Sequence, residues 1–403
     1  MPVESIKVQC CIAGGGPAGM MAGFLLVRAG VDVVVLEKHA DFLRDFRGDT
    51  IHPSTLEVMH ELGLLDRLLK LPHNPAPRIN AQFGDMSLVV ADFSHLPTHA
   101  KFIALMPQWD FLNFLAEAGR RYAQFKLRMK TEATDLIEEN GRVTGVRATG
   151  PAGDLEIRAD LVVAADGRHS TLREVSKLPV QVLGAPMDVL WFRLPSKPDD
   201  PAETMGRFAD GHIFVMLNRG DYWQCGFVIR KGSIEQVHAR GLEAFRAAVL
   251  RSAPFAADRV ETIASWDDVK LLTVAVDRMP TWYRPGLLFI GDAAHAMSPI
   301  GGVGVNLAVQ DAVAAANILG KRLRDGKLTL DDLDAVQRRR EFPTRATQRF
   351  QVFMQDRVVT RALDGDIEAK PPLGVRMIAR MPALSRIPAR LIGLGVRPEH
   401  VKA

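Results

Sequence analysis

The stretch CCIAGGGPAGMMAG, residues 10–23, decides the fold of this chain. It follows an apolar run, IKVQCCIA, and opens a second apolar run with helical spacing that stops near Gly30. A β-branched run, VDVVVLEK, comes next, so the order is strand, glycine turn, helix and strand. This order is typical of the βαβ unit that begins a dinucleotide-binding fold.

The glycine pattern of this stretch suits a pyrophosphate group. Glycines allow a tight turn and a close approach of phosphate to the backbone, and the helix N-terminus supplies N–H groups and partial positive charge. Glu37 closes the second strand, where a carboxylate can accept hydrogen bonds from both ribose hydroxyls. A structural turn without a ligand is the alternative interpretation. The cofactor-binding candidates in this segment are Gly14, Gly16, Pro17, Ala18, Gly19, Glu37 and Lys38.

Two later segments also have an apolar strand followed by aspartate and glycine. The first, DLVVAADGRHSTLRE, ends its strand at Asp166, and the second, LLFIGDAAHAMSPIGGVGVN, carries Asp292 behind its strand. An aspartate at a strand end can accept a hydrogen bond from a ribityl hydroxyl. The N-terminus of a helix that begins near Val305 can stabilise negative charge on a flavin ring.

In this order, the three motifs resemble class A flavoprotein monooxygenases, typified by para-hydroxybenzoate hydroxylase. The resemblance covers roughly residues 1–320, and its late motif runs to P-x-G-G-x-G-x-N. It implies FAD, with O2 as co-substrate and NADPH or NADH as a transient electron donor, because the chain has a single GxGxxG pattern. The sequence departs from the common family pattern at Ser298, Val303 and Val305, in the region expected to face oxygen and substrate.

The resemblance also implies roles for individual residues. Arg47 is expected to neutralise pyrophosphate charge, and Gln108 to lie along the ribityl and phosphate chain. Asp166 is expected to contact FAD and the nicotinamide donor, and Asp292 to bind the ribityl chain. The other cofactor-binding candidates of the late motif are Gly291, Gly304, Val305 and Asn306. The catalytic candidates are Pro299, Val305, Asn306 and His52.

The substrate contacts are the least specific part of the sequence. The resemblance places the substrate beside the flavin, against an inserted sheet that contains the hairpin HIFVMLNRGDYWQCGFVIRKG. An alternating apolar face is also typical of a protein core, and His52 could equally be a buried, satisfied histidine. The substrate candidates are Phe214, Met216, Tyr222, Trp223 and Arg193.

The expected fold class is α/β. An FAD-binding Rossmann-like domain of the glutathione-reductase type carries an inserted, mostly antiparallel β-sheet substrate domain and a helical C-terminal tail. Residues 180–275 are expected to be mainly strand. The expected FAD-binding parts are residues 1–73, 106–178 and 277–330, the substrate parts are 74–105 and 179–276, and the helical region is 331–403.

Composition and charge narrow the classes of partner. Among 403 residues, 51 Lys and Arg stand against 47 Asp and Glu, a net +4 without a basic block, which argues against nucleic acid. No apolar run reaches about 18 residues, so no membrane-spanning segment is expected. The basic tail is expected to pack on the domain, with membrane-surface contact as the alternative. Three cysteines and no HExxH or CxxC pattern predict a cytoplasmic location and no metal site. Monomer and homodimer both stay open.

The expected function is that of an FAD-dependent, NAD(P)H-using monooxygenase. By resemblance, it inserts one oxygen atom of O2 into a small aromatic or heteroaromatic molecule, through a flavin C4a-(hydro)peroxide in a water-poor cavity. Hydroxylation and Baeyer–Villiger insertion both occur on this scaffold, and a flavin-dependent reductase of an unsaturated substrate is a further alternative. A flavoprotein without turnover, acting as a redox sensor or a partner-binding module, is the alternative from another class.

Overall fold

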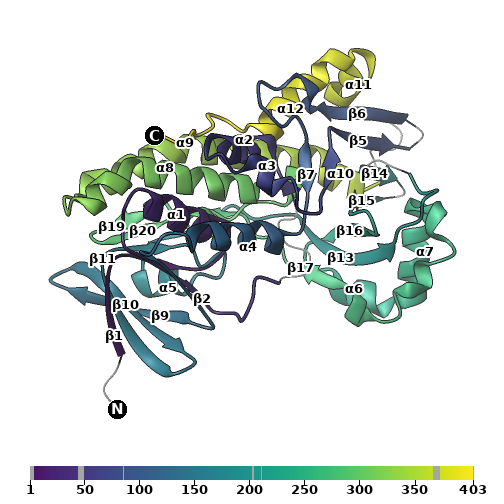
Figure 1. Ribbon diagram of the computed structural model, residues 1–403. Coiled ribbons are helices and arrows are strands. Elements are labelled where there is room, and N and C mark those ends of the chain that lie inside the picture. The colour runs from purple at the N-terminus through teal and green to yellow at the C-terminus, as the bar shows by residue number, and fades with distance from the viewer. Residues whose placement is uncertain are drawn as a thin grey trace.

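Two large sheets dominate the molecule, and the chain passes between them several times (Figure 1). The architecture is the α/β fold with an inserted sheet and a helical C-terminal region that the sequence predicts. The computed structural model describes residues 4–43, 50–84, 86–201, 204–209, 211–365 and 373–402.

The first sheet is built around the strand that leads into the glycine segment. Its main path has the order β19-β20-β11-β1-β2-β8, and every pair from β20 to β8 is parallel. Parallel strands that are buried on both faces need apolar side chains throughout, which explains the continuous apolar runs. The strands are β1 (Glu4–Ala13), β2 (Val33–Glu37), β8 (Phe125–Met129), β9 (Glu132–Glu139), β10 (Arg142–Gly150), β11 (Gly153–Ala164), β19 (Tyr283–Arg284) and β20 (Leu287–Phe289).

The two faces of this sheet are covered differently. Cys10 and Ile12 of β1 pack against a layer of helices over one face (Figure 1). Cys11 and Ala13 point the other way, into a cluster formed with the antiparallel strands β9 and β10. The alternation follows from the two-residue period of a strand. The covering helices are α1 (Pro17–Arg28), α4 (Gln108–Gly119) and α8 (Gly304–Arg324).

The second sheet is mostly antiparallel and joins two distant parts of the chain. Its order is β17-β13-β16-β15-β14-β5-β6, and β14 pairs parallel with β5. Its strands come from residues 78–92 and 187–272, and the division of the chain into domains stays a prediction. They are β5 (Arg78–Phe83), β6 (Met86–Asp92), β13 (Met187–Pro195), β14 (Met205–Ala209), β15 (His212–Asn218), β16 (Tyr222–Arg230) and β17 (Lys270–Leu272).

Two small sheets complete the strand pairing. Strand β7 pairs antiparallel with both β3 and β4, and so ties the chain before α2 to the start of the second sheet. Strands β12 and β18 pair where the chain leaves the first sheet and where it returns. The strands are β3 (Thr50–Ile51), β4 (Asn74–Ala76), β7 (Ile103–Leu105), β12 (Gln181–Val182) and β18 (Asp277–Arg278).

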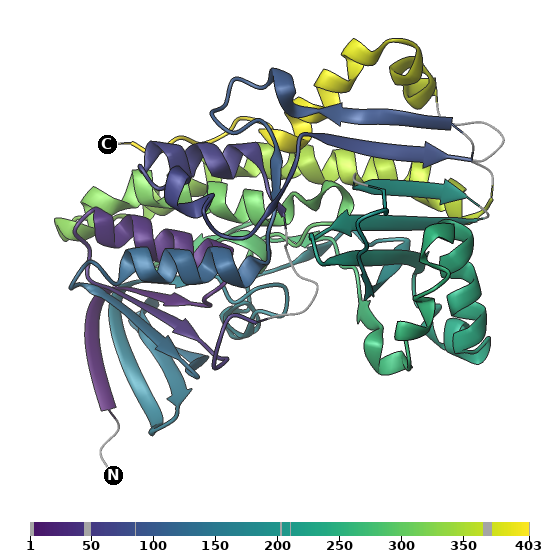
Figure 2. The same ribbon diagram turned by 45° about the vertical axis from the view of Figure 1, so that its right-hand side comes forward.

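Residues 180–275 contain the expected strands and also two helices that the sequence-based expectation did not include. Helices α6 (Ile234–Ala239) and α7 (Leu242–Ser252) follow β16 and lie beside the second sheet (Figure 2). Phe245 and Val249 of α7 pack into the core on one face of that sheet. The segment LEAFRAAVLRS has helical spacing, but a window this short does not separate a helix from a strand.

The long helix α9 (Leu330–Met354) reaches from the first sheet to the second (Figure 2). Leu333 and Val336 near its start belong to the core beside the first sheet, whereas Met354 at its end packs against a core of the second. A π-helical turn, Gln355–Val359, follows directly. The remaining helices are α2 (Pro53–Glu61), α3 (Leu65–Leu68), α5 (Thr171–Ser176), α10 (Thr360–Leu363), α11 (Leu373–Arg380) and α12 (Arg386–Gly393).

The basic tail packs on the domain through α12, as predicted. Ala389 and Gly393 are buried in a cluster with Phe93 and Leu96, and a Cβ at Gly393 would lie 2.7 Å from the Leu96 side chain. Glycine therefore permits the close approach of this helix. Ile387 of the same helix is 61% exposed.

One described helical segment, Ile300–Arg324, is long and apolar enough to cross a membrane by length and composition. However, 72% of its apolar window is buried within the fold. Its side chains pack with α1 and the first sheet, which is the behaviour of a core helix.

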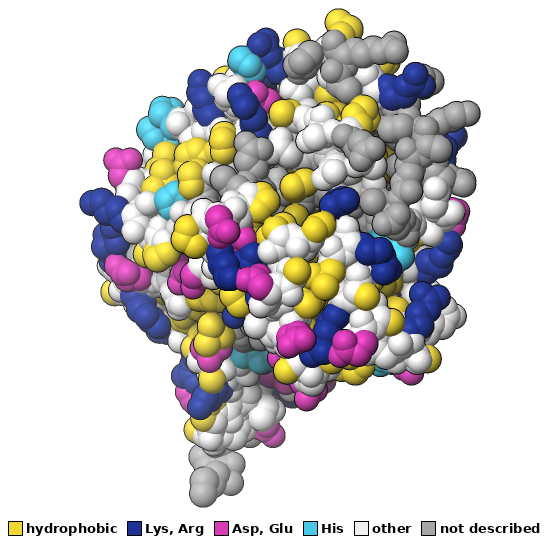
Figure 3. All heavy atoms as spheres, turned by 90° about the vertical axis from the view of Figure 1, so that its right-hand side faces the viewer, with side chains coloured by type: hydrophobic (Ala, Val, Ile, Leu, Met, Phe, Trp, Pro, Cys, Tyr) yellow, Lys and Arg dark blue, Asp and Glu magenta, His cyan; other side chains and the backbone are white. Residues whose placement is uncertain are grey.

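The surface around the second sheet carries charges of both signs. Figure 3 shows Lys and Arg side chains on this face scattered among Asp, Glu and apolar side chains. This pattern agrees with the small net charge of +4 and with the absence of a basic block in the sequence.

Candidate functional site

The first glycine segment is shaped by close approaches of the main chain. A Cβ at Gly19 would lie 1.9 Å from the carbonyl oxygen of Gly14, and one at Gly14 would lie 2.3 Å from that of Ala165. A side chain at either position would therefore force α1, β1 and β11 apart. Gly16 differs, because a Cβ there would meet no described atom within 4 Å. That open space lies at the N-terminus of α1, where a phosphate can be received.

Glu37 ends β2 beside this turn. Its carboxylate accepts hydrogen bonds from the main-chain N–H groups of Gly15 at 3.1 Å and His39 at 3.0 Å, and the side chain is buried. This is the position that the sequence predicts for a ribose-binding carboxylate. Lys38 instead pairs with Glu132 at 3.4 Å on the surface, which gives no support to its predicted cofactor contact.

Asp166 follows β11 and lies directly beside the glycine turn, since a Cβ at Gly14 would be 2.8 Å from the Asp166 Cα. Its Oδ2 accepts from the Leu172 N–H at 3.1 Å, whereas Oδ1 is buried without a hydrogen-bond partner among the described residues. Burial raises the pKa of this carboxyl, and hydrogen bonds from Ser170 and Leu172 act in the opposite direction. An unpaired acceptor is therefore available to a polar ligand at this point.

The second glycine-rich segment, residues 291–306, meets the first. A 3₁₀ turn, Gly291–Ala293, follows β20. A Cβ at Gly291 would lie 3.0 Å from the Cβ of Ala18 in the first turn of α1. The two segments are therefore neighbours in space although they are far apart in the sequence, and they border one site.

Asp292 is linked to the Asp-Gly segment by arginines. Arg168 Nη2 lies 3.4 Å from Oδ2 of Asp292, whose side chain is 31% exposed. Arg173 donates to the Ala293 carbonyl at 3.4 Å and to Asp277 at 3.2 Å. The three motifs thus form one connected surface with a carboxylate that a ligand can reach.

The second glycine-rich segment ends in a loop with left-handed backbone. Gly301 and Gly302 have φ values of +77° and +63°, which other residues rarely adopt. The Thr50 hydroxyl donates to the Gly302 carbonyl at 3.2 Å. Helix α8 begins at Gly304, where a Cβ would meet nothing within 4 Å in the described structure. As at Gly16, a helix N-terminus opens on free space.

Asn306 fixes the start of α8 to the segment before α2. Its Oδ1 accepts hydrogen bonds from the Thr55 hydroxyl at 2.7 Å and from the His52 main-chain N–H at 3.1 Å. Its Nδ2 is buried and has no partner within the described part of the chain. The first turn of a helix leaves its N–H groups unpaired inside the helix, so the Val305 and Asn306 amides are compatible with their predicted role at a flavin oxygen.

His52 is fully buried against the glycine loop. Its Nδ1 lies 2.8 Å from the Ile392 carbonyl, so this nitrogen carries the proton of the neutral ring. Burial lowers the pKa of His52 to about 4, although the Ile392 contact acts the other way. Nε2 lies 3.5 Å from the Cβ position of Gly302 and lacks a hydrogen-bond partner in the part that is described. The histidine is buried and borders the loop, but its Nε2 is not satisfied, and a position near the flavin stays a prediction.

A buried ion network supports the Gly-Asp turn from behind. Asp311 of α8 accepts from the Gly291 N–H at 3.0 Å and lies 2.6 Å from Nε2 of His295. Arg340 of α9 donates to the other Asp311 oxygen at 2.9 Å and lies 3.4 Å from Glu399 in the tail. Burial acts to raise the pKa of Asp311, but His295 and Arg340 lower it overall. Sequence reasoning missed this network, because a charged residue on an amphipathic helix is normally exposed.

Strand register divides the predicted substrate contacts into two groups. Phe214, Met216 and Trp223 project into the core beneath α7 and are at most 2% exposed. This placement favours the core interpretation over a substrate contact for all three. Arg193 and Tyr222 occupy the alternate positions and so face the other side of the sheet, with the guanidinium 4.8 Å from the ring centre.

Trp191 lies on the same face as Arg193, two residues earlier in β13. A Cβ at the neighbouring Gly226 would be 3.0 Å from its ring, so glycine makes room for the indole. The indole Nε1 is buried and has no hydrogen-bond partner among the residues described. Ile300 of the glycine loop packs against the same apolar cluster. Sequence reasoning missed Trp191, because Phe192 beside it is equally apolar and the buried face was ambiguous.

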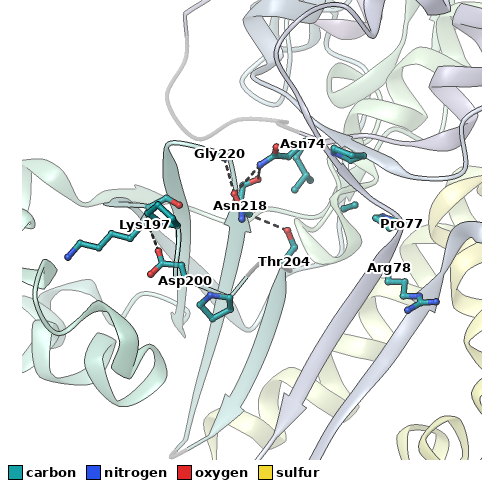
Figure 4. Close-up of a pocket in the computed structure, with 14 residues that line it drawn as sticks. Asn74, Pro77, Arg78, Lys197, Asp200, Thr204, Asn218 and Gly220 are labelled. Atoms are coloured by element: carbon teal, nitrogen blue, oxygen red, sulfur yellow. Dashed lines mark hydrogen bonds between the residues drawn. The ribbon is translucent and has the colours of Figure 1, made fainter.

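A cavity of about 410 Å³ opens between the second sheet and the β3-β7-β4 sheet (Figure 4). Asn74 and Asn218 point toward one another at its edge, with the Asn74 amide donating to the Asn218 side-chain oxygen at 3.0 Å. Leu105 lines the same cavity and pairs with Thr50 in the small sheet. Because Thr50 holds Gly302, the cavity is separated from the glycine loop by little more than one strand.

These residues fit FAD. Open helix N-termini at Gly16 and Gly304 suit a phosphate and an electron-rich ring edge, and Asp166 offers an unpaired acceptor between them. Gln108 begins α4, as predicted. Arg47 lies outside the described residues, so its predicted pyrophosphate contact stays a prediction.

Comparison with known proteins agrees with this chemistry. Residues 7–350 match the FAD binding domain family. A 6-methylpretetramide 4-monooxygenase from Streptomyces rimosus is 32% identical over 393 residues, which cover 97% of this chain and 93% of the relative. A para-nitrophenol 4-monooxygenase from Pseudomonas sp. (strain WBC-3) is 25% identical and aligned over 82% of each chain.

Solved structures share the fold. An anhydrotetracycline hydroxylase from Streptomyces rimosus has a TM-score of 0.76 at 23% identity, over 99% of this chain and 78% of the other. A p-nitrophenol 4-monooxygenase from Pseudomonas putida DLL-E4 has a TM-score of 0.74 at 23% identity, over 95% and 99%. The chain therefore belongs to the FAD binding domain family and is an FAD-dependent monooxygenase.

Proposed function

We propose that this enzyme uses NADPH or NADH as electron donor and inserts one atom of O2 into an aromatic or heteroaromatic substrate. FAD, when bound, would supply the oxygen chemistry, while the residues of this chain would bind and orient it and exclude water. An aromatic substrate is supported by the relatives, which include monooxygenases of 6-methylpretetramide and of para-nitrophenol.

The observation that carries the proposal is the position of Gly291, where a Cβ would lie 3.0 Å from Ala18 at the start of α1 and 3.3 Å from Ala308 near the start of α8, so that the first turns of both helices border one site. We place the ADP half of FAD on the first glycine segment, with Glu37 as the acceptor for the ribose hydroxyls. The pyrophosphate would lie before Gly16, where the structure leaves space, and we assign the neutralisation of its charge to Arg47.

The flavin half would lie along the other motifs. Asp166 and Asp292 would accept hydrogen bonds from the ribityl chain, and Gln108 would lie beside it. The amides at the start of α8, Val305 and Asn306, would stabilise negative charge on the ring. Pro299 would border the reacting oxygen, in the part of the loop that Gln351 of α9 holds through Ser298 and Ile300.

We place the substrate on the sheet face that carries Trp191, Arg193 and Tyr222. A flat indole and an arginine stacked on a tyrosine suit a flat, electron-rich ring that can ionise. The adjoining cavity of about 410 Å³ is within the usual size of small-molecule sites, which supports a substrate with fused rings. His52 would act through the loop that it contacts, as a neutral group.

We propose a cytoplasmic location. Cys10, Cys11 and Cys225, all in the described chain, are buried thiols, and burial raises the pKa of each above its ordinary value. Such thiols are stable in a reducing compartment and contribute to packing like small apolar side chains.

The test measures NADPH, NADH and O2 consumption by the purified flavoprotein with a panel of single-ring and fused-ring phenols. A product that gains the mass of one oxygen atom supports the proposal, and its NMR spectrum separates a hydroxyl group from a Baeyer–Villiger ester. A product that gains a pair of hydrogen atoms, or donor oxidation that no compound stimulates, would overturn it.

Two variants test the proposed substrate face. Trp191→Phe removes an N–H that makes no described hydrogen bond, so it should fold normally and raise KM at least several-fold. Phe214→Leu is the matched control on the opposite face of the same sheet. It should lower stability, because the smaller side chain leaves space in the buried core, and leave KM unchanged. The reverse pattern would place the substrate elsewhere.

A further inference from the structure

Buried glutamines on one side of α9 and at the start of the π-helical turn hold the chain that leads into the second glycine loop. None is more than 8% exposed. The side-chain amides of three of them bond to main-chain atoms between residues 277 and 300, and the fourth bonds to the Ser298 hydroxyl, so elements that are remote in sequence fix this path. The glutamines are Gln337, Gln348, Gln351 and Gln355.

Gln351 clamps both sides of Pro299. Its Oε1 accepts from the Ser298 N–H at 3.2 Å, and its Nε2 donates to the carbonyls of Ser298 and Ile300, both at 2.9 Å. Pro299 has no N–H to donate, and Gly301 after it has left-handed backbone; the main chain closes the turn with a bond from the Gly302 N–H to the Pro299 carbonyl at 3.0 Å, which leaves the peptide groups of Ser298 and Ile300 to Gln351. One amide therefore fixes the direction of the peptide groups around Pro299.

Gln355 acts on the same point from the π-helical turn. Its Nε2 donates to the Ser298 hydroxyl at 2.9 Å, and that oxygen also lies 3.4 Å from the Ile300 N–H. Val358 in the same turn packs in the cluster that joins the second sheet to Ile300. Isolated π-helical turns are rare and frequently occur at functional sites.

Ser298 is chemically matched to the two glutamines. It is one of the positions where this chain departs from the pattern of the resembling family, in which proline is common. Proline could neither donate to Gln351 nor accept from Gln355. The serine, 2% exposed, makes both bonds.

We propose that Gln351 and Gln355 are positioning residues, which act through Ser298 to set where residues 299–303 lie against the flavin ring. The inference rests on the placement of the ring proposed above. It goes further in assigning control of that loop to α9 and the π-helical turn, which lie outside the three nucleotide motifs. A shift of this loop would change the binding and the environment of the ring without touching the pyrophosphate end.

The experiment compares apoprotein variants reconstituted with FAD. Gln351→Leu loses three hydrogen bonds to the loop and should raise the Kd for FAD about tenfold. It should also shift the midpoint potential and the visible circular dichroism of bound FAD. Gln337→Leu is the matched control on the same helix, because Gln337 bonds to Trp282 and Pro280, away from the loop. It should lower thermal stability but leave Kd within about twofold, with potential and spectrum unchanged.

A second pair of variants, each expected to disturb the fold less, keeps the test valid if Gln351→Leu misfolds. Gln355→Leu should shift the same spectrum in the wild-type background and have no further effect in Ser298→Ala, because the shared hydroxyl is already gone. Values for Gln351→Leu and Gln355→Leu that match those of Gln337→Leu would overturn the inference. These readouts need no substrate, so a failure to find an oxygenated product would count against the proposed function alone.

Discussion

The two glycine-rich segments border one site, but they are held in opposite ways. The first takes its shape from main-chain contacts, as in the approach of Gly19 to Gly14 and of Gly14 to Ala165. The second is held mainly by side chains, with Asp311 on the Gly291 amide and Gln351 on the peptides around Pro299. Main-chain contacts determine the shape of the first glycine-rich segment. Side chains from the helices packed behind the second segment determine the shape of that segment.

This difference separates two tasks of the site. A pyrophosphate is the same in every FAD enzyme, so a turn built from close main-chain contacts can serve without variation. The part of the site that holds the flavin ring must suit the reaction with oxygen and the substrate. Side chains from other elements shape this part, and they can be exchanged without disrupting the fold. We expect substitutions in the first segment to affect folding and FAD binding together. Substitutions in the helices behind the second segment should have effects on FAD binding that vary in size.

The largest effect is expected for Gly19→Ala. Its Cβ would lie 1.9 Å from the Gly14 carbonyl oxygen, so α1 or β1 must move, at a cost of more than about 4 kcal/mol. We expect little folded protein and no bound FAD, as measured by thermal unfolding and by flavin content after purification.

Gly16→Ala is the matched change in the same turn. Its Cβ would meet no described atom within 4 Å, and its backbone, with φ of −73°, is ordinary for alanine. The apoprotein should unfold within about 1 kcal/mol of wild type, while FAD binding weakens because the methyl group occupies the phosphate space. Equal stability of the two variants would contradict the idea that backbone contact shapes this loop.

The features that the sequence could predict lie around the first glycine-rich segment, and those that it could not predict lie behind the second. The βαβ unit, Glu37 and Asp166 were placed correctly, because their signals lie in short stretches with the period of a strand or a helix. Asp311, Arg340 and Gln351 carried no signal, because a buried polar residue on a helix is recognised only when its partner is known. The partners stand on other elements, up to 59 residues away.

The sheet face shows the same limit in another form. Alternation in β15 and β16 correctly indicated one buried side, but both sides of this sheet are apolar. Only the packing of α7 shows that Phe214 and Trp223 belong to a core and that Tyr222 does not. The sequence analysis did not predict helix α7, and without this helix there was no reason to choose which face of the second sheet is buried.

The second largest effect is expected for Asp311→Ala. The change leaves Arg340 buried without its 2.9 Å partner and removes the acceptor of the Gly291 N–H. Breaking a buried ion pair in this way costs about 3–5 kcal/mol, which should appear in urea unfolding of the apoprotein. FAD affinity should fall as well, because the Gly-Asp turn loses its support.

Glu341→Ala is the control for the neighbouring position on α9. Glu341 pairs with Arg345 at 3.1 Å, and both side chains are about 40% exposed, so the loss should stay below about 1 kcal/mol. If both variants lost a comparable free energy of unfolding, the buried network behind the second segment would contribute no more to stability than a surface ion pair.

A smaller, pH-dependent effect is expected from His52. Its pKa is about 4 in the folded protein against an ordinary 6.5, so below pH 6.5 the unfolded chain binds a proton that the folded chain excludes. Stability should therefore fall as the pH drops from 6.5 to 4, by about 3 kcal/mol from this group. Above pH 6.5 His52 contributes no pH dependence.

The measurement compares the free energy of unfolding of wild type and His52→Gln across this range. The stability advantage of wild type should shrink steadily on acidification, because glutamine does not titrate. His169→Gln serves as the control, since that histidine is exposed and its replacement should leave the difference nearly constant. If the difference in stability between wild type and His52→Gln stayed constant with pH, burial would not lower the pKa of His52 in the folded protein.

The smallest effect, and the sharpest test of the comparison, is expected for Gly304→Ala. The residue begins α8 with helical backbone, and a Cβ there would meet no atom of the described structure within 4 Å. Alanine restricts the unfolded chain more than glycine, so the apoprotein should gain about 0.5 kcal/mol in urea unfolding. The same methyl group would project into the space proposed for the ring, so FAD affinity should fall while stability rises. Opposite signs in the two measurements would place the ring at this helix end, whereas FAD affinity equal to wild type would move it elsewhere.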